Sequence, residues 1–268
     1  MEGVEGASHL ICRGAELGWK RIVLTGVHGQ RFLGCGLGLR SAGVEIEAFG
    51  STGDYLASGL DGASITVHSN AQDQIGQILN SGKLVVHGDV GQTFMYGAKG
   101  GEVFILGNAA GRPLINAVGK PRVVINGTCL DYLAESFMAG DPLNGGGFVI
   151  LNALGFDGNG KAFDLPEPYP GGNLFSLASG GAIYLRDPKG KVGEDQLNGG
   201  RIVPLAEKDW ETILPYLREN ERLFGISVED VLLRKDGEQV KPWEIYKKVE
   251  VMPLTALPKS EQIDDDTD

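Results

Sequence analysis

The sequence has few of the side chains on which metal sites and nucleophilic active sites depend. Its 268 residues include 4 histidines and 3 cysteines, and Cys12, Cys35 and Cys129 stand far apart with no CxxC pair. A zinc ribbon or an iron–sulfur cluster needs more thiolate ligands at closer spacing. Cys129 is expected to pack as a small buried hydrophobe, with a Cys–His pair formed only in space as the alternative. We therefore predict no metal-binding and no catalytic residue.

The stretch GCGLG at residues 34–38 has alternate glycines but lacks the rest of a nucleotide-binding loop. The dinucleotide fingerprint would need a further glycine at position 39 or 41, where the chain has Leu39 and Ser41. The residues that follow, VEIEAF, alternate as in a strand and do not open a helix. No glycine loop is followed by Lys-Ser or Lys-Thr, so the mononucleotide loop is absent too. We expect no cofactor-binding residue in this chain, and the glycines need another explanation.

Positive charge is also scarce. The formal net charge is −11, whereas a nucleic-acid partner would call for a basic face, so we expect no nucleic acid. Five acidic side chains lie in the last eight residues: Glu261, Asp264, Asp265, Asp266 and Asp268. Residues 261–268 are therefore expected to be an acidic disordered tail. No run approaches 18 apolar residues, and the first residues lack the pattern of a secretory signal, which predicts no membrane partner and a cytoplasmic location.

Glycine is the residue in excess. The chain has 42 glycines in 268 residues, about twice the usual share of roughly 7%. Collagen is excluded because the glycines do not recur at every third position. A disordered composition is excluded because 42% of the residues are hydrophobic. Glycine together with valine and isoleucine favours many short strands joined by tight turns.

A repeat of 19 to 20 residues explains this composition. Six segments each place a β-rich run before a turn: RIVLTGVHGQ, VEIEAFGSTG, SITVHSNAQ, KLVVHGDVGQ, EVFILGNAAG and RVVINGTCL. Their turn positions are Gly26, Gly50, Ser69, Gly88, Gly107 and Gly127, and the last four intervals are 19, 19, 19 and 20 residues. This period is too short for propeller blades or two-helix repeats. It suits coils of short strands stacked about 4.8 Å apart, so we predict an all-β fold, a single-stranded parallel β-helix.

Residues counted back from each turn form rows of one character. Two rows are entirely apolar and are expected to face the interior: Leu24, Ala48, Val67, Val86, Ile105 and Ile125, and Ile22, Ile46, Ile65, Leu84, Val103 and Val123. The row between them changes from polar to apolar along the chain: Val23, Glu47, Thr66, Val85, Phe104 and Val124. The outer face is therefore expected to be covered part-way along, by a partner or by another element of this chain.

The glycines are assigned to corners between strands. A corner needs either a positive φ or a residue without a side chain where two backbones approach. On this interpretation GCGLG forms the second corner of the first coil and bends the chain. The predicted structural turn glycines are Gly26, Gly29, Gly34, Gly36, Gly38, Gly50, Gly53, Gly88, Gly91, Gly107 and Gly127.

His68 and His87 occupy equivalent positions one coil apart, so their rings are expected about 5 Å from each other. Their column continues with Phe49, Leu106 and Asn126, which supply neither thiolate nor carboxylate. A zinc site needs three or four protein ligands, so the pair is interpreted as structural.

The repeat and its interruptions divide the chain into four parts. Residues 1–18 are a lead segment, 19–204 the β-helix domain, 205–260 a helical cap with a closing strand, and 261–268 the tail. An insertion at about 155–170 breaks the period, because the prolines of the adjoining run PEPYPGG cannot pair in a central strand. Such an insertion either contacts a partner or is a tolerated surface loop.

The segment after Leu205 has the spacing of helices, in DWETILPYLRENERLFG and SVEDVLLRKDG. We expect Pro215 in the first turn of the first helix and Gly225 at its end, and Ser227 and Asp230 as a capping pair. These helices are expected to close one end of the solenoid. KPWEIYKKVEVMP then reads as a closing extended strand.

Several phrases together resemble the family named for its GXGXG repeats, which includes the C-terminal β-helix domain of the glutamate synthase large subunit. They are GQRFLGCGLG, GSTGDYLASGLDGASITV, GKLVVHGDVG, GEVFILGNAAGRP, GGNLFSLASGGAIYLRD and YKKVEVMP. The resemblance implies a right-handed β-helix with a structural role beside catalytic domains. Residue 2 is Glu2 where the amidotransferase of that enzyme has its nucleophilic cysteine, and no cysteine cluster or barrel precedes the repeat. The catalytic residues of glutamate synthase are therefore not carried over.

The resemblance implies a free-standing structural subunit of a glutamate-synthase-type complex. The expected partners are an amidotransferase subunit and an FMN-binding subunit, and FMN and an iron–sulfur cluster would be held there and not in this chain. No turnover is expected from the chain alone. The alternatives are the equivalent β-helix component of a formylmethanofuran dehydrogenase, or of another amidotransferase-linked oxidoreductase, and an enzyme that uses an exposed groove. A homo-oligomer is compatible with the sequence, which gives no copy number.

Overall fold

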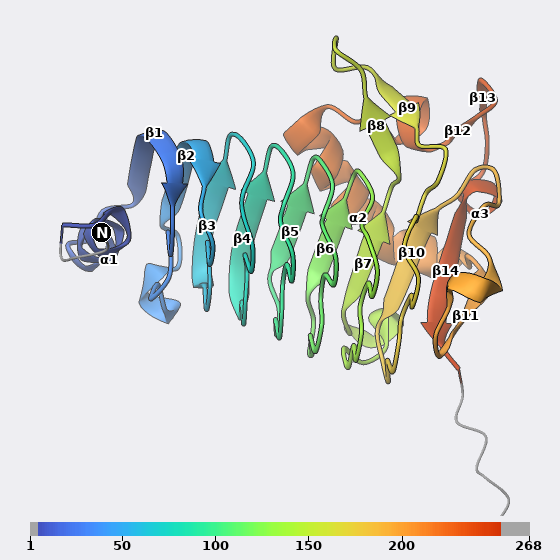
Figure 1. Ribbon diagram of the computed structural model, residues 1–268, viewed down its shortest axis with the longest axis horizontal. Helices are drawn as coiled ribbons and strands as arrows, with labels where there is room; N and C mark the ends of the chain where they lie inside the picture. The colour runs from blue at the N-terminus through green and yellow to red at the C-terminus, as the bar shows by residue number, and fades with distance from the viewer. Residues whose placement is uncertain (1–4, 253–268) are drawn as a thin grey trace, which may run out of the picture.

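The computed structural model describes residues 5–252, so the predicted tail at 261–268 lies outside the described residues. Eight parallel strands stack side by side, followed by two antiparallel ones, in the order β1-β2-β3-β4-β5-β6-β7-β10-β14-β11 (Figure 1). These strands are β1 (Arg21–Gln30), β2 (Glu45–Thr52), β3 (Asp61–Val67), β4 (Ser81–Val86), β5 (Glu102–Ile105), β6 (Arg122–Ile125), β7 (Phe148–Leu151), β10 (Ala182–Arg186), β14 (Tyr246–Val251) and β11 (Gly200–Pro204). The stack confirms the predicted all-β parallel β-helix.

The helices and minor strands lie around this stack. The α-helices are α1 (Ala7–Glu16), α2 (Glu207–Phe224) and α3 (Pro242–Ile245). Short helical turns are η1 (Leu39–Ser41), η2 (Pro142–Asn144), η3 (Glu194–Gln196) and η4 (Val228–Leu232), and two hairpins are formed by β8 (Leu154–Phe156) with β9 (Ala162–Asp164) and β12 (Arg234–Lys235) with β13 (Glu238–Gln239). Over residues 5–252, no helix combines the length and the apolar character that a membrane crossing requires.

The strand register is the one that the repeat predicts. Ile46 pairs with Ile65 and Ile65 with Leu84, so residues at the same place in the repeat stack directly on each other. The two predicted inward rows are buried except for the half-buried Leu24 at the N-terminal end. They form the core of the solenoid, to which every coil contributes equivalent apolar side chains.

The second side of each coil is built from a backbone that alternates in handedness. Positive φ recurs at every other residue, as in Tyr55, Ala57 and Gly59. The amide of Ala57 donates backwards to Leu33 O and the amide of Gly59 donates forwards to Gln77 O, both at 2.8 Å. The amides of consecutive positive-φ residues therefore donate in turn to the coils on either side, which satisfies them without a regular strand.

GCGLG belongs to this alternating side and is not a corner, so its predicted role is wrong. Gly34 and Gly36 have φ values of 75° and 78° and occupy the first-coil equivalents of Ala57 and Gly59. Gly38 lies outside the alternation, at φ −86° before η1, and a Cβ there would have no neighbour within 4 Å. Within the stretch, Leu37 O accepts from the amide of Asp61 in the next coil at 3.1 Å. Gly38 has no geometric need to be glycine.

The outer face is covered by α2, which lies behind the strands in Figure 1. Val85, Phe104 and Val124 are at most 1% exposed and share one apolar cluster with Ile213 and Leu217 of the helix. For these coils, the mixed row is therefore covered by an element of this chain, which was one of the two predicted alternatives. We expected the helix to close an end of the solenoid, whereas it lies along its side.

Pro215 lies inside α2 and not in its first turn, which corrects the predicted start of the helix. The helix begins at Glu207, where Asp209 accepts a hydrogen bond from the amide of Ala206 at 3.3 Å. Packing of α2 on the sheet is sufficient to accommodate a proline that local propensity would place at the start. Gly225 ends the helix at φ 72° and Ser227 accepts from the amide of Asp230 at 3.1 Å, both as predicted.

The two ends of the solenoid are closed differently. At the N-terminal end α1, in the segment expected only as a lead, buries Ile11 against the first coil. At the other end β14 pairs antiparallel with β10 and β11 with β14. β14 is the expected closing strand, and it is preceded by the short helix α3.

The insertion contains a hairpin that projects from the body of the molecule, formed by β8 and β9 (Figure 1). Its second half packs back on the solenoid. Tyr169, in the proline-rich run, is 2% exposed and its hydroxyl donates to Gly172 O at 2.8 Å. Gln196 also donates to Tyr169 O at 2.7 Å. The insertion is therefore partly a structural element and only partly a free loop.

Candidate functional site

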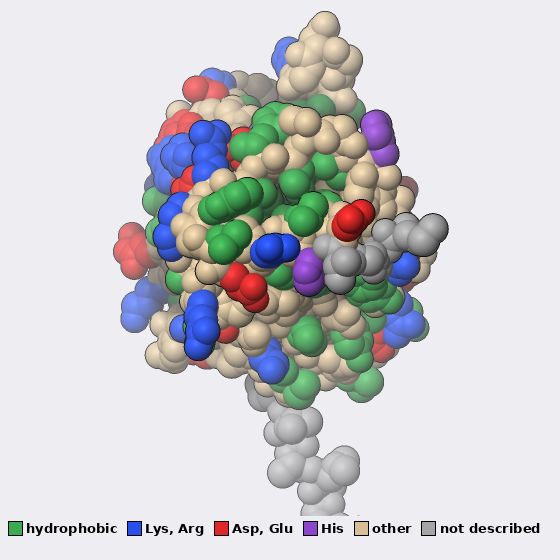
Figure 2. All heavy atoms as spheres, turned by 90° about the vertical axis from the view of Figure 1, so that its left-hand side faces the viewer, with side chains coloured by type: hydrophobic (Ala, Val, Ile, Leu, Met, Phe, Trp, Pro, Cys, Tyr) green, Lys and Arg blue, Asp and Glu red, His purple; other side chains and the backbone are tan. Residues whose placement is uncertain are grey.

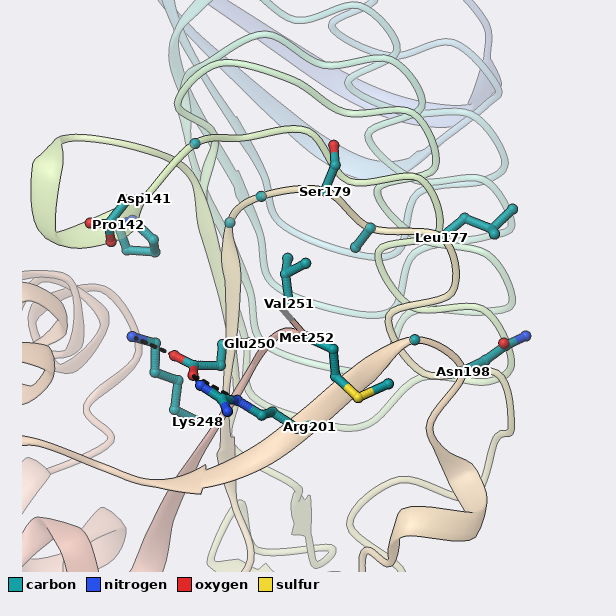
Figure 3. A pocket seen from close by; sticks show the side chains of 15 residues that line it. Asp141, Pro142, Leu177, Ser179, Asn198, Arg201, Lys248, Glu250, Val251 and Met252 are labelled. Atoms are coloured by element: carbon teal, nitrogen blue, oxygen red, sulfur yellow. Dashed lines mark hydrogen bonds and ion pairs between the residues drawn. The ribbon is translucent and has the colours of Figure 1, made fainter. Parts of the chain in front are cut away.

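A groove of about 1260 Å³ lies at the C-terminal end of the solenoid. One wall is the last coil, from Leu177 to Gly181, and the opposite wall is formed by the ends of β11 and β14 (Figure 3). The corner at Gly140, Asp141 and Pro142 closes one side of the groove. Sequence reasoning did not find it, because its lining comes from separate segments spread over residues 140–252.

The two cationic side chains of the groove, Arg201 and Lys248, are paired with carboxylates. Arg201 donates to Glu250 Oε1 through Nε at 3.0 Å and Nη2 at 2.6 Å. Lys248 Nζ lies 3.0 Å from Asp209 Oδ1 and 3.5 Å from Glu250 Oε2 (Figure 3 shows the pair with Glu250). Because each cation faces a carboxylate, the floor offers mixed polarity and no concentrated charge for an ionic ligand.

A buried phenol lies behind this floor. Tyr184 donates from its hydroxyl to Asp209 Oδ1 at 2.8 Å. Burial, together with the hydrogen bond to that carboxylate, raises the pKa of Tyr184, so the phenol stays protonated. Asp209 also accepts from the amide of Ala206 before α2. Tyr184, Asp209 and Lys248 therefore form a network that fixes the start of α2 on β10 and β14.

A second buried polar network joins α2 to the middle of the solenoid. Asn126 and Asn220 exchange hydrogen bonds between their amide groups at 2.8 and 2.9 Å. Asn152 donates to Asn126 Oδ1 at 2.8 Å and accepts from the hydroxyl of Tyr246 at 2.8 Å. The three asparagines are fully buried. Asn126 and Asn152 come from equivalent positions of successive coils. The sequence analysis placed Asn126 in this column but did not extend the column to Asn152.

His68 and His87 stack with a centroid distance of 5.1 Å, as the repeat predicts. The stack continues at 4.2 Å to Phe49 on one side and at 5.0 Å, edge to face, to Phe224 of α2 on the other. Burial, with the charge of His68 as a smaller cause, lowers the pKa of His87. The column is an aromatic ladder along the edge of the outer face. Among residues 5–252, no group of three or more His, Cys, Asp or Glu side chains has the geometry of a metal site.

Cys129 is fully buried, and burial raises the pKa of its thiol. It packs in the core of the solenoid among apolar side chains. A thiol in this environment stays protonated and is a poor nucleophile, as expected of a small buried hydrophobe.

The corner glycines fall into two overlapping groups. Gly26, Gly29 and Gly50 have positive φ values of 66°, 75° and 121°. The second group lies where a Cβ would meet atoms of the preceding coil at 2.0–2.4 Å, and it includes Gly50 as well as Gly53, Gly88, Gly91, Gly107 and Gly127. Several of these atoms are side-chain oxygens of a ladder in which each Asx side chain accepts from the amide of the next coil. Its members include Asn70, Asp89 and Asn108, with distances of 2.8, 2.7 and 2.9 Å.

The N-terminal end of the solenoid exposes large apolar side chains. Leu17, Trp19 and Leu39 are 68%, 57% and 74% exposed. Figure 2, which faces this end, shows hydrophobic side chains interspersed with charged ones. This surface and the groove lie at opposite ends of the stack.

Comparison with known proteins relates nearly the whole solenoid to one family. The model of the GXGXG motif family matches residues 10–248. The chain is also 32% identical over 230 residues to an uncharacterized protein of Methanocaldococcus jannaschii. That alignment covers 83% of this chain and 82% of the relative.

Proposed function

The chain belongs to the GXGXG motif family, and on this basis we propose that it is a structural subunit of a glutamate-synthase-type complex. In that role it would position an amidotransferase subunit and an FMN-binding subunit while they convert glutamine and 2-oxoglutarate into glutamate. Family membership over residues 10–248 is the observation that carries the proposal. The complex is proposed to be cytoplasmic, with FMN and the iron–sulfur cluster in the partners.

The architecture supports a scaffolding role. The interior of the solenoid is filled by apolar side chains from every coil, so the molecule is a rigid rod of stacked coils and not a container. The two cations of the groove are paired with carboxylates of the same chain. The apolar surface at Leu17, Trp19 and Leu39 lies at one end of the stack and the open groove at the other. Two separated surfaces suit a subunit that holds two partners apart.

The test is recovery of the tagged full-length chain from the organism that encodes it, with partners identified by mass spectrometry. The expected eluate contains an amidotransferase chain and an FMN-binding chain, shows flavin absorbance and forms glutamate from glutamine and 2-oxoglutarate. Recovery with molybdenum or tungsten enzyme subunits would replace the proposal by the formylmethanofuran dehydrogenase alternative. A chain recovered alone at low salt would refute the scaffolding role.

A second sample separates scaffolding from catalysis. The partner subunits are assayed with and without this chain, and the chain is assayed alone. Scaffolding predicts no glutamate from the chain alone and a lower rate of glutamine-dependent synthesis when the chain is left out. Glutamate formation by the chain alone would contradict the proposal.

A further inference from the structure

The last coil has backbone groups that lack the hydrogen-bond partner found in the five coils before it. At one position of the alternating side, the amide donates to a carbonyl of the following coil at 2.7–2.9 Å. These bonds are Gly59 to Gln77, Ile78 to Tyr96, Gly97 to Ile115, Asn116 to Glu135 and Ser136 to Ser176. The equivalent residue of the last coil is Leu177, whose amide has no hydrogen-bond partner within residues 5–252. Its side chain is 75% exposed.

The carbonyl one residue later follows the same pattern. It accepts from an amide of the following coil at 2.8–2.9 Å in five successive coils. The acceptors are Leu60, Leu79, Ala98, Ala117 and Phe137. In the last coil this position is Ala178, and no described residue donates to its carbonyl oxygen. A donor at Leu177 and an acceptor at Ala178 thus stand open at adjacent residues.

The chain supplies a substitute neighbour for only part of this coil. The amide of Leu174 donates to Gln196 O at 2.8 Å, and Leu174 O accepts from Asn198 at 3.0 Å. Gly199 then passes close to the amide of Leu177, since a Cβ on it would lie 3.6 Å from that nitrogen, but it accepts no hydrogen bond from it. The chain continues into β11, and β14 pairs with β10 and β11. The groove of Figure 3 lies between residues 196–199 and the end of β14, along the last coil at Leu177 to Gly181.

We propose that an extended segment of a partner subunit binds in this groove as the next rung of the solenoid. Its backbone carbonyl accepts from the amide of Leu177, and one of its amides donates to Ala178 O. An extended peptide is the ligand whose hydrogen-bonding groups match an open β-type edge. Leu177, Pro142 and Met252 give the groove an apolar lining, which favours small apolar side chains in the segment. This inference rests on the proposed function, because the partner is a subunit of that complex.

Hydrogen–deuterium exchange, resolved to Leu177 by fragmentation, tests the proposal on the free chain and on the recovered complex. We expect fast exchange in the free chain and at least about tenfold slower exchange in the complex. A complex in which Leu177 exchanges as fast as in the free chain would overturn this inference and leave the scaffolding role intact. Recovery of no partner would overturn both.

Two other occupants give different results in the same measurement. If residues 253–268 fill the groove, Leu177 is protected in the free chain and becomes fast after truncation at Met252. If a second copy of the chain fills it, protection appears in the free chain and rises with its concentration. Either result would replace the partner segment as the occupant.

A charged side chain in the groove gives an independent test. Leu177→Asp keeps a residue type that tolerates the observed φ of 53° and adds a carboxylate to a groove that Asp141 and Glu250 also line. Leu130→Asp is the matched control, since Leu130 is 50% exposed and does not line the groove. We expect the first variant to weaken partner binding by about tenfold or more and the control by less than about twofold. Wild-type binding by Leu177→Asp, with unchanged circular dichroism in both variants, would contradict the proposal.

Discussion

At the scale of the residue, this fold depends on which positions lack a side chain and which accept positive φ. The alternating side tolerates many residue types: Tyr55, Met95 and Leu114 all have φ near 60°. The corners that carry the Asx ladder do not, because a Cβ would overlap a ladder oxygen. Glycine is therefore required at the ladder corners, where two backbones approach closely, whereas the positive φ of the alternating side does not require it.

Gly107 and Gly111 allow this distinction to be measured. A Cβ on Gly107 would lie 2.2 Å from Asp89 Oδ1, which accepts the amide of Asn108. Gly107→Ala is expected to lower the free energy of unfolding by about 1–3 kcal/mol through overpacking. Gly111→Ala is the control, because its Cβ would have only Leu130 Cβ at 4.0 Å, and a change within about 0.5 kcal/mol is expected. Equal urea midpoints for the two variants would refute the close-approach argument.

His87 should make stability depend on pH. Its pKa is lowered from 6.5 by burial and by His68, so the unfolded state binds a proton at a higher pH than the folded state. Its contribution to stability is fully present above about pH 6.5 and is lost as the pH falls through the lowered value. His87→Phe keeps the ring against Phe224 and removes the titration. The free energy of unfolding, measured in urea between about pH 8 and pH 5, should fall less steeply with decreasing pH for this variant than for the wild type. The same pH dependence for both proteins would contradict the prediction.

At the scale of the element, α2 defines how much of the outer face remains free. It contacts the stack through an ion pair of Glu219 with Lys83 at 2.6 Å and through the asparagine network. The pKa of Glu219 is lowered to about 2, mainly by the hydrogen bond from Arg222 and further by the hydrogen bond from Lys83. The same face is open beyond the end of the helix, where Val23 and Phe49 are 48% and 43% exposed.

The asparagine network should contribute more than any exposed hydrogen bond of the helix. Asn220→Ala leaves the side-chain nitrogen and the side-chain oxygen of the buried Asn126 with one partner fewer each, and a loss of about 1–3 kcal/mol in unfolding free energy is expected. Thr212→Ala removes an exposed hydroxyl of the same helix, bonded at 2.8 Å to Lys208 O, and should change stability by less than about 0.5 kcal/mol. The prediction fails if the two variants unfold at the same urea concentration.

The strands and their register could be predicted from the sequence because the repeat is local and its apolar rows are complete. The position of α2 could not, since Asn126 and Asn220 are 94 residues apart and nothing local marks the pair. GCGLG was misassigned because most coils place other residues at the same positive-φ positions, which hides the alternation. The groove was missed because it arises from the absence of a coil, and a repeat pattern does not show what its last member lacks.

At the scale of the whole molecule, the solenoid is a chain of nearest-neighbour contacts with two different ends. Each coil bonds to the coil before and the coil after it, so local changes should stay local. The N-terminal coil depends on α1, which buries Ile11 and brings Cys12 Sγ to 3.1 Å from Cys35 O. The C-terminal coil depends on β14 and on the turn at Gln196.

Removal of residues 1–17 tests this nearest-neighbour behaviour. Without α1, Ile22 and Leu33 of the first coil lose part of their cover, and amide exchange in β1 should accelerate by about tenfold or more. Exchange in β4 to β6 should stay unchanged. Leu10→Ser is the control on the exposed face of α1, where Leu10 is 53% exposed, and should alter neither region. Uniform acceleration throughout the chain would show that the solenoid unfolds as one unit.

The stacking of equivalent coils also sets the length of the molecule in equal steps. Seven steps of about 4.8 Å separate the first parallel strand from the eighth, so β1 and β10 lie about 34 Å apart. Each gained or lost repeat would change that separation by one step and leave both terminal surfaces intact. Distance between bound neighbours can therefore be adjusted by duplication or deletion of a single repeat, in quanta that no point substitution can supply.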